Sequence, residues 1–137
     1  MERTLFLIKP DAVSKKIAGK IIDILEKNDL HIAEMKMLRL DTETAEKFYK
    51  EHKNKKFYHK LIKYVTSGPI IAMVLEGEDA IKRARKIIGS TDPKKAEPGT
   101  IRNLFGTDRT YNAVHASDSP ESAEYEINII FNNNENN

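Results

Sequence analysis

The 137-residue sequence contains no cysteine and no tryptophan. The absence of cysteine excludes disulfides and thiolate metal sites, and it agrees with a reducing compartment. No apolar run approaches the roughly 20 residues that a membrane-spanning helix needs, and the first residues show no signal-peptide pattern. We therefore expect a cytoplasmic protein without a membrane partner.

Strong net charge and the common nucleotide-binding loops are also missing. A formal charge of +2 is too small to indicate nucleic-acid binding by itself. The sequence has no G-x-x-x-x-G-K-[ST] and no G-x-G-x-x-G motif, and it lacks H-E-x-x-H and G-x-S-x-G as well. Any phosphate site must therefore be built from scattered side chains.

The composition that remains is that of a globular protein, with 39% hydrophobic and 32% charged residues. A chain of this length fits one domain with a core of useful size. We therefore treat residues 1–137 as a single domain. The asparagine-rich residues 132–137 are expected to form a disordered tail.

Hydrophobic periodicity predicts an alternation of strands and helices. The expected strands span residues 4–8, 31–40, 70–75 and 113–116. The expected helices span residues 17–28, 41 or 42 to about 52, 57–65, 78–88 and 120–131, and residues 90–100 read as a long loop. This order favours an α/β sandwich of the ferredoxin-like type, with a four-stranded antiparallel sheet and helices packed on at least one face.

The most informative stretch spans residues 112–123. Ser119 and Pro120 suit the N-cap and first position of a helix, and the apolar stripe of that helix also contains Glu126. A buried carboxylate needs a partner, and Ser117 and His115 lie just upstream. A histidine steadied in this way is a candidate nucleophile or base; the alternative is a structural histidine that caps a turn.

Three basic residues are candidates for a phosphate site. Arg85 lies on the flank of the apolar stripe of helix 78–88, where its guanidinium either snorkels to water or is placed for a ligand. Arg102 follows a Pro-Gly-Thr turn and reads most simply as surface charge. Lys9 stands at the end of an apolar strand, where ligands often gather, but lysines without a functional role are also common there.

Several motifs in this sequence resemble those of the nucleoside diphosphate kinase family. They are RTLFLIKPD at 3–11, SGP at 67–69, PGTIR at 98–102 and NAVHASDSPESA at 112–123. The motifs follow one another in the family's order, and the match runs from about residue 2 to residue 131, so the resemblance covers nearly the whole chain. It implies the same ferredoxin-like fold.

The resemblance also implies roles for individual residues. His115 would accept the phosphoryl group and become phosphohistidine, with Glu126 and Ser117 holding its ring. The residues around the phosphates would be Lys9, Tyr49, His52, Arg85, Thr91 and Arg102. Lys9 and Asn112 would reach the ribose, and Phe57 would stack on the base beside Leu61. By spacing alone, Tyr49, Phe57 and Leu61 read instead as helix core.

The implied reaction moves the γ-phosphate of ATP or another nucleoside triphosphate to a nucleoside diphosphate in two steps through His115. Mg²⁺ is the implied cofactor, carried by the nucleotide phosphates, since no carboxylate cluster suggests a protein-built metal site. Because a stacked aromatic ring accepts any base, we expect broad base specificity. The family forms hexamers and tetramers, and we favour a homo-hexamer.

The sequence departs from the family's common pattern in two places, and two other functions remain open. Asn103-Leu104-Phe105 stands where many members have Gly-Asp-Phe. Arg109 stands where many place an apolar residue over the base.

One other function is a nucleic-acid-binding module that uses the basic segment 82–102; nucleic acid is therefore a possible secondary partner. The second is a protein that passes the phosphohistidine phosphate to protein acceptors.

Overall fold

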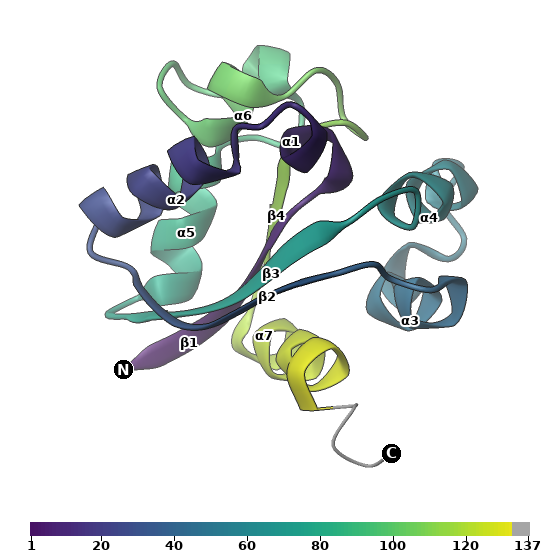
Figure 1. Ribbon diagram of the computed structural model, residues 1–137, viewed down its shortest axis with the longest axis horizontal. Coiled ribbons are helices and arrows are strands. Elements are labelled where there is room, and N and C mark those ends of the chain that lie inside the picture. The colour runs from purple at the N-terminus through teal and green to yellow at the C-terminus, as the bar shows by residue number, and fades with distance from the viewer. Residues whose placement is uncertain (133–137) are drawn as a thin grey trace.

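The computed structural model describes residues 1–132, which contain one antiparallel sheet of four strands (Figure 1). The strands are β1 (Glu2–Ile8), β2 (His31–Leu38), β3 (Ile70–Gly77) and β4 (Val114–Ala116). Their order in the sheet is β2-β3-β1-β4. With one helical crossover before β2 and another before β4, this is the ferredoxin-like arrangement, and the predicted fold class is confirmed.

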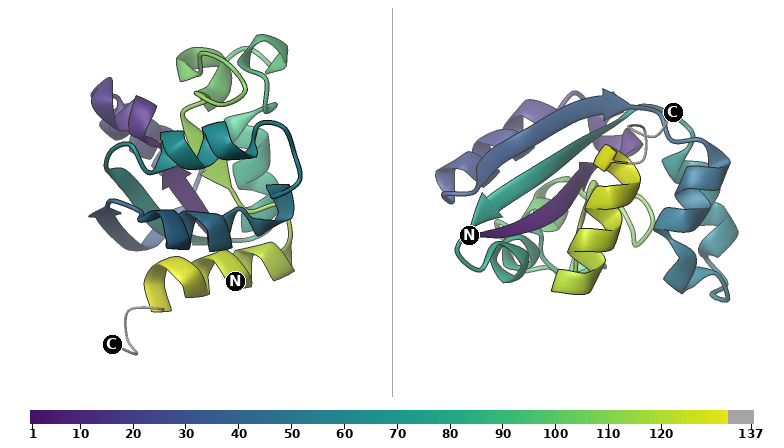
Figure 2. Two further views of the ribbon diagram at one scale, coloured as in Figure 1. Left: turned by 90° about the vertical axis from the view of Figure 1, so that its right-hand side faces the viewer. Right: turned by 90° about the horizontal axis from the view of Figure 1, so that it is seen from below.

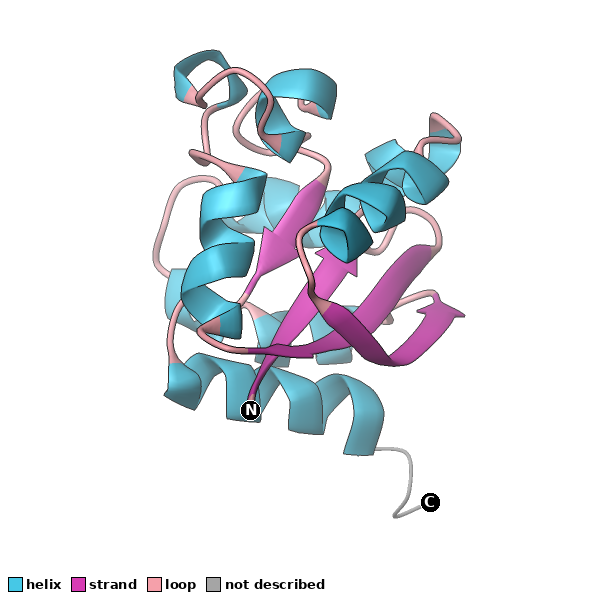
Figure 3. Cartoon of the chain, turned by 90° about the vertical axis from the view of Figure 1, so that its left-hand side faces the viewer, coloured by secondary structure: helices cyan, strands magenta, loops and turns pink. Residues whose placement is uncertain are grey.

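Helices cover both faces of the sheet (Figures 1 and 2). One face carries α2 (Ala18–Lys27) and α5 (Ala80–Ile88), with the short α1 (Pro10–Ser14) and α6 (Ile101–Phe105) at one end. The opposite face carries α3 (Thr42–Phe48), α4 (Tyr58–Val65) and α7 (Pro120–Ile127). The remaining turns are η1 (Lys50–His52), η2 (Pro93–Lys95) and the π-helical η3 (Asn128–Asn132). Figure 3 shows the sheet between these layers.

The sequence of β1 explains why the sheet is covered on both sides. Successive side chains of a strand point to opposite faces. Leu5 and Leu7 pack in the core beneath α3, α4 and α7, while Phe6 and Ile8 pack in the core beneath α2 and α5. All four are fully buried, so the nearly continuous apolar run of this strand fits a central position.

The structure corrects several predicted boundaries. The helix expected up to residue 52 ends at Phe48, and the chain then turns through Tyr49 into η1. The predicted loop 90–100 contains η2, and α1 and α6 were not predicted at all. Asn132 belongs to η3, whereas the rest of the predicted disordered tail, 133–137, lies outside the described residues. No helix within residues 1–132 is both long and apolar enough to cross a membrane.

Candidate active site

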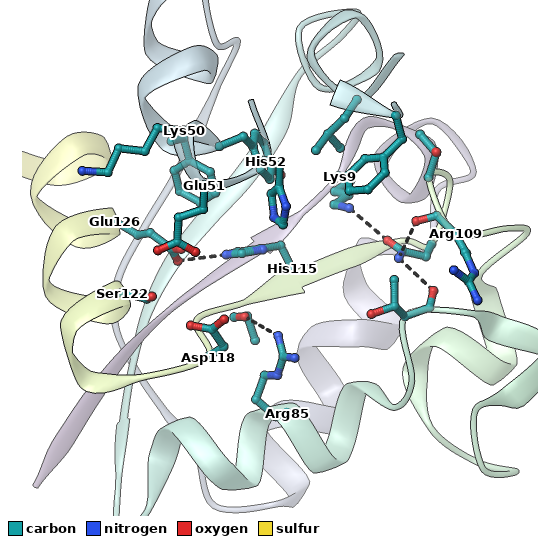
Figure 4. Close-up of a pocket in the computed structure, with 18 of the residues that line it drawn as sticks. Lys9, Lys50, Glu51, His52, Arg85, Arg109, His115, Asp118, Ser122 and Glu126 are labelled. Atoms are coloured by element: carbon teal, nitrogen blue, oxygen red, sulfur yellow. Dashed lines mark hydrogen bonds and ion pairs between the residues drawn. The ribbon is translucent and has the colours of Figure 1, made fainter. Parts of the chain in front are cut away.

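A pocket of about 490 Å³ opens between α3, α4, α7 and the edge strand β4 (Figure 4). Its volume lies in the range of small-molecule and cofactor sites. The structure brings all the predicted site residues except Ser117 to its lining. They are Lys9, Tyr49, His52, Phe57, Leu61, Arg85, Thr91, Arg102, Asn112, His115 and Glu126.

His115 is the middle residue of β4, opposite Leu7 of β1. Its neighbours Val114 and Ala116 are buried in the core beneath α2 and α5. The alternation of the strand therefore turns His115 to the other face, toward the pocket. There, the Phe48 ring packs edge-on against the imidazole with the ring centroids 5.0 Å apart, which restricts the orientation of the imidazole.

A chain of hydrogen bonds fixes one nitrogen of this imidazole. His115 Nε2 lies 2.9 Å from Glu126 Oε1 (Figure 4), and the Ser117 hydroxyl donates to the same carboxylate oxygen at 2.8 Å. The Leu5 N–H of β1 in turn donates to Ser117 Oγ at 3.2 Å. Ser117 therefore acts on the ring through Glu126, which it orients, and not through a bond of its own to the imidazole.

Two arginines bond to the backbone on either side of His115. Arg102 donates to the carbonyls of Val114 (2.9 Å) and Gly89 (3.2 Å), and Arg85 donates to the Ala116 carbonyl (3.1 Å). β4 is a sheet edge whose outer carbonyls have no strand partner, so these guanidinium groups satisfy backbone acceptors while facing the pocket.

Arg102 is only 5% exposed, so its interpretation as surface charge is wrong. Burial, followed by the charge of nearby Arg85, lowers the pKa of Arg102 to about 10. The guanidinium therefore remains charged at neutral pH. A buried cation beside a second cation is costly unless an anion comes close.

Lys9 follows β1 and lies at the pocket floor with Arg85 and Arg102. Its ammonium donates to Asn112 Oδ1 at 2.9 Å, and the Asn112 amide donates to the carbonyls of Thr91 (3.1 Å) and Arg109 (3.0 Å). Burial, with a further contribution from Arg102, lowers the pKa of Lys9 from 10.5 to about 7. The amine is thus poised to gain a proton when negative charge enters the pocket.

The backbone just before His115 is in an uncommon conformation. Ala113 has a φ of 75°, in the left-handed region that residues other than glycine rarely occupy. Its N–H donates to the Asp11 carboxylate at 3.1 Å, and its carbonyl accepts from the Lys9 N–H at 2.9 Å. The segment after β1 therefore fixes the peptide that sets the position of His115.

Three buried polar atoms in the pocket have no hydrogen-bond partner within residues 1–132: Tyr49 Oη, His52 Nδ1 and Arg102 Nε. Burial, and then the negative charge of Glu126, raises the pKa of Tyr49. Burial, and then the charge of Lys55, lowers the pKa of His52. Buried polar groups are normally paired, so the three atoms together indicate a site for an acidic ligand with several oxygen atoms.

The rim of the pocket is more apolar. Phe57 is 43% exposed, so its interpretation as helix core is wrong, whereas Tyr49 and Leu61 are buried in the core and also reach the pocket. An exposed aromatic ring beside a pocket offers a flat surface on which a planar group can stack. The pocket thus has a cationic floor and an aromatic rim.

Comparison with known proteins agrees with this geometry. Residues 2–136 match the model of the family described as nucleoside diphosphate kinase. The chain belongs to the nucleoside diphosphate kinase family. A nucleoside diphosphate kinase of Methanocaldococcus jannaschii is 54% identical over 134 residues, which are 98% of this chain and 96% of that protein. The predicted family is confirmed, and with it the prediction that the chain is an enzyme of the phosphotransferase class.

Solved nucleoside diphosphate kinases have the same fold. A crystal form of the Aquifex aeolicus enzyme matches with a TM-score of 0.92 and 51% identity, covering 95% of this chain and 94% of that one. The halophilic enzyme from Halobacterium salinarum, solved in complex with CDP, matches with a TM-score of 0.93 and 40% identity, covering 98% of this chain and 90% of that one.

Several pocket residues of this family member were missed by sequence reasoning. They are Phe48, Lys50, Glu51, Thr110, Ala116, Asp118, Glu121, Ser122 and Tyr125. Phe48 shares the apolar stripe of its helix and so looked like ordinary core. Arg109, which differs from the family's common pattern, also lines the pocket, at the side opposite Glu126 and Ser122 (Figure 4). Its Nε lies 3.8 Å from the Asp92 carboxylate.

Proposed function

We propose that this chain transfers the γ-phosphoryl group of a nucleoside triphosphate to a nucleoside diphosphate through a phosphohistidine at His115. The observation that carries the proposal is the fixed imidazole of His115. It is bonded through Nε2 to Glu126 and lies in a pocket that also contains Lys9, Arg85 and Arg102. A nucleophile held beside several cations fits phosphoryl transfer, in which catalysis is mostly positioning and charge stabilisation.

The Glu126 hydrogen bond decides which nitrogen reacts. An ionised carboxylate can only accept hydrogen bonds, so the proton of the neutral imidazole is on Nε2 and the free lone pair is on Nδ1. Nδ1 of His115 attacks the γ-phosphorus, and the bond from that phosphorus to the β-phosphate oxygen breaks. The first diphosphate leaves, and a terminal oxygen of the second diphosphate attacks the phosphohistidine, which restores the neutral ring.

Phosphate binding would use the cations and the unpartnered polar atoms. Arg85, Arg102 and Lys9 would neutralise phosphate charge, and the Tyr49 hydroxyl would donate to a phosphate oxygen, with His52 and Thr91 at the same end. Asn112 with Lys9 would bind the ribose hydroxyls, and Phe57 with Leu61 would hold the base. Because cations dominate this floor, we propose that Mg²⁺ enters bound to the nucleotide. When bound there, it shields phosphate charge.

The experiment that tests the proposal uses ATP labelled at the γ-phosphate. The protein should become labelled, the label should be lost in acid as expected for a phosphohistidine, and an added nucleoside diphosphate should carry it away. Label that resists acid would contradict the histidine intermediate. Label that moves only to added proteins, and not to nucleoside diphosphates, would support a protein phosphotransferase instead.

Base specificity should be broad. Stacking on Phe57 reads no hydrogen-bonding edge of the base, so most recognition would come from the phosphates and ribose that all nucleotides share. We expect kcat/KM for the common nucleoside triphosphates to differ by less than about tenfold, measured with a single acceptor diphosphate. Strict use of one base would show that the rim, which includes Arg109, forms hydrogen bonds with the edge of the base.

We further propose a homo-oligomer, with a hexamer favoured over a tetramer, and a cytoplasmic location. Strand β2 is a sheet edge on which Met35 and Met37 are 54% and 60% exposed, and exposed apolar edges favour association. Light scattering should give the mass of six chains. Met35→Lys combined with Met37→Lys should shift the protein to smaller species; an unchanged mass would place the contact elsewhere.

A further inference from the structure

The phosphate-facing segment, which we define as residues 47–52, is joined to α7 by one tyrosine. The Tyr125 hydroxyl donates to the Lys47 carbonyl at 2.8 Å, and the Lys50 ammonium lies 4.1 Å from the centroid of the Tyr125 ring. No other hydrogen bond connects residues 42–57 with α7 in the part of the chain that the structure describes. Figure 4 shows Lys50 extending from this segment toward α7.

The two elements that Tyr125 joins carry different parts of the site. Helix α7 contains Glu126, the next residue in the chain, which fixes His115. The phosphate-facing segment contains Tyr49 and His52, whose buried Oη and Nδ1 atoms have no partner. Tyr125 therefore connects the wall that holds the nucleophile with the wall that offers polar atoms to the phosphates.

Apart from the buried rings of Phe48 and Tyr49, the phosphate-facing segment has few contacts that fix its position. Helix α3 has only seven residues, and its last carbonyls, including that of Lys47, have no donor further along the helix. After His52 the chain runs through the exposed residues 53–57 before α4 begins. Exposed turns between short helices open locally at low free-energy cost, so a single hydrogen bond from a well-anchored helix has a measurable effect on their position.

We propose that Tyr125 is a positioning residue that holds the phosphate-facing segment against α7, so that Tyr49 and His52 reach the phosphates of a nucleotide bound at His115. The inference rests on the proposed function, because it takes the ligand to be a nucleotide. When the binding-competent position is populated for only part of the time, the apparent affinity falls by that fraction. Tyr125 would keep this fraction close to one.

The test is Tyr125→Phe, which keeps the ring beneath Lys50 and removes only the hydroxyl. We expect the Kd for ADP and the KM for nucleotides to rise about two- to tenfold, the range that follows from losing one exposed hydrogen bond, while kcat changes by less than twofold. Hydrogen exchange should become faster at the amides of residues 49–56 and stay unchanged in the sheet. A thermal melt should confirm that the variant is folded at the assay temperature.

Phosphorylation by phosphoramidate separates this role from an effect on His115. That small donor phosphorylates histidine without a nucleotide, so the rate should be the same in Tyr125→Phe as in the wild type. A slower rate would mean that Tyr125 acts through Glu126, and would overturn the inference. Unchanged Kd and unchanged exchange at residues 49–56 would overturn it too, even if phosphoryl transfer between nucleotides is intact.

Tyr111→Phe is the matched control. Tyr111 also has a lysine near its ring, with Lys60 Nζ 5.5 Å from the centroid, but its hydroxyl makes no hydrogen bond within the described residues and it is not part of the pocket lining. This variant should keep the wild-type Kd for ADP. The hydrogen-exchange and ADP-binding results decide the role of Tyr125 even if the wild type fails to transfer phosphate, which would overturn only the proposed function.

Discussion

His115→Ala is expected to abolish both phosphoenzyme formation and phosphoryl exchange between nucleotides, with a fall in kcat of more than about ten-thousandfold. The reason is that the substitution removes the atom that we propose forms the covalent intermediate, while leaving the cationic floor of the pocket in place. The measurement is transfer of labelled γ-phosphate from ATP to a diphosphate, together with acid-labile label on the protein. ADP should still bind, because Lys9, Arg85 and Arg102 remain.

The control for this variant is His59→Ala. His59 is an exposed histidine of α4 that does not line the pocket, so its removal tests whether a histidine outside the pocket contributes to labelling. It should retain full activity. If His115→Ala kept substantial turnover, or if the label were found on another residue, phosphoryl transfer would have to proceed without the proposed intermediate.

The hydrogen bond between His115 and Glu126 could be anticipated from local sequence. Ser119 and Pro120 define where α7 begins, and that start places Glu126 on the buried stripe of the helix, as found. Alternation within β4 then puts His115 on the same side of the sheet. These are short-range regularities of strands and helices, which is why sequence patterns carry them well.

The burial of Arg102 could not be anticipated in this way. Its guanidinium bonds to the carbonyls of Gly89 and Val114, which come from a different loop and a different strand. The five-residue helix that holds it is too short to show a periodic pattern. The resemblance to a family placed Arg102 in the site, whereas its position after a Pro-Gly-Thr turn suggested surface charge.

Contacts between distant segments were beyond reach for the same reason. Lys9 and Asn112 are separated by 103 positions yet share a hydrogen bond, and Tyr125 reaches back 78 positions to Lys47. Neither Lys47 nor Tyr125 stands out by residue type or spacing, and only the resemblance placed Asn112 at the same end of the ligand as Lys9. Only the order of strands in the sheet, which local patterns do not determine, brings such segments together.

The second large effect expected is a pH dependence of nucleotide binding that depends on Lys9. Its pKa is about 7 in the protein without ligand, so above pH 7 the amine is mostly neutral. Phosphate at hydrogen-bonding distance favours the charged form, so a nucleotide bound above pH 7 should bring a proton with it. Affinity for ADP should then fall as pH rises from about 8 to 9.5, by up to about tenfold per pH unit.

The sign of this effect follows from proton counting. Binding that takes up a proton weakens as protons become scarce, and below pH 7 the amine is already charged, so the slope should disappear there. Calorimetry in two buffers of different ionisation enthalpy should give an uptake approaching one proton per ADP at pH 8.5, where the nucleotide phosphates are themselves fully ionised. No uptake at that pH would mean that Lys9 keeps its charge in the free protein.

Lys9→Met provides the decisive comparison, because methionine keeps most of the apolar stem and removes the titrating amine. The variant should bind ADP without the pH slope, and kcat/KM should fall by about a hundredfold, as when one fixed donor to a charged transition state is lost. Without nucleotide, the free energy of unfolding of the wild type should rise with pH between about 7 and 10.5, since the unfolded chain binds the Lys9 proton more tightly over that window. In Lys9→Met this rise should be absent. If the variant kept the pH dependence of both ADP affinity and unfolding free energy, a group other than Lys9 would be responsible for them.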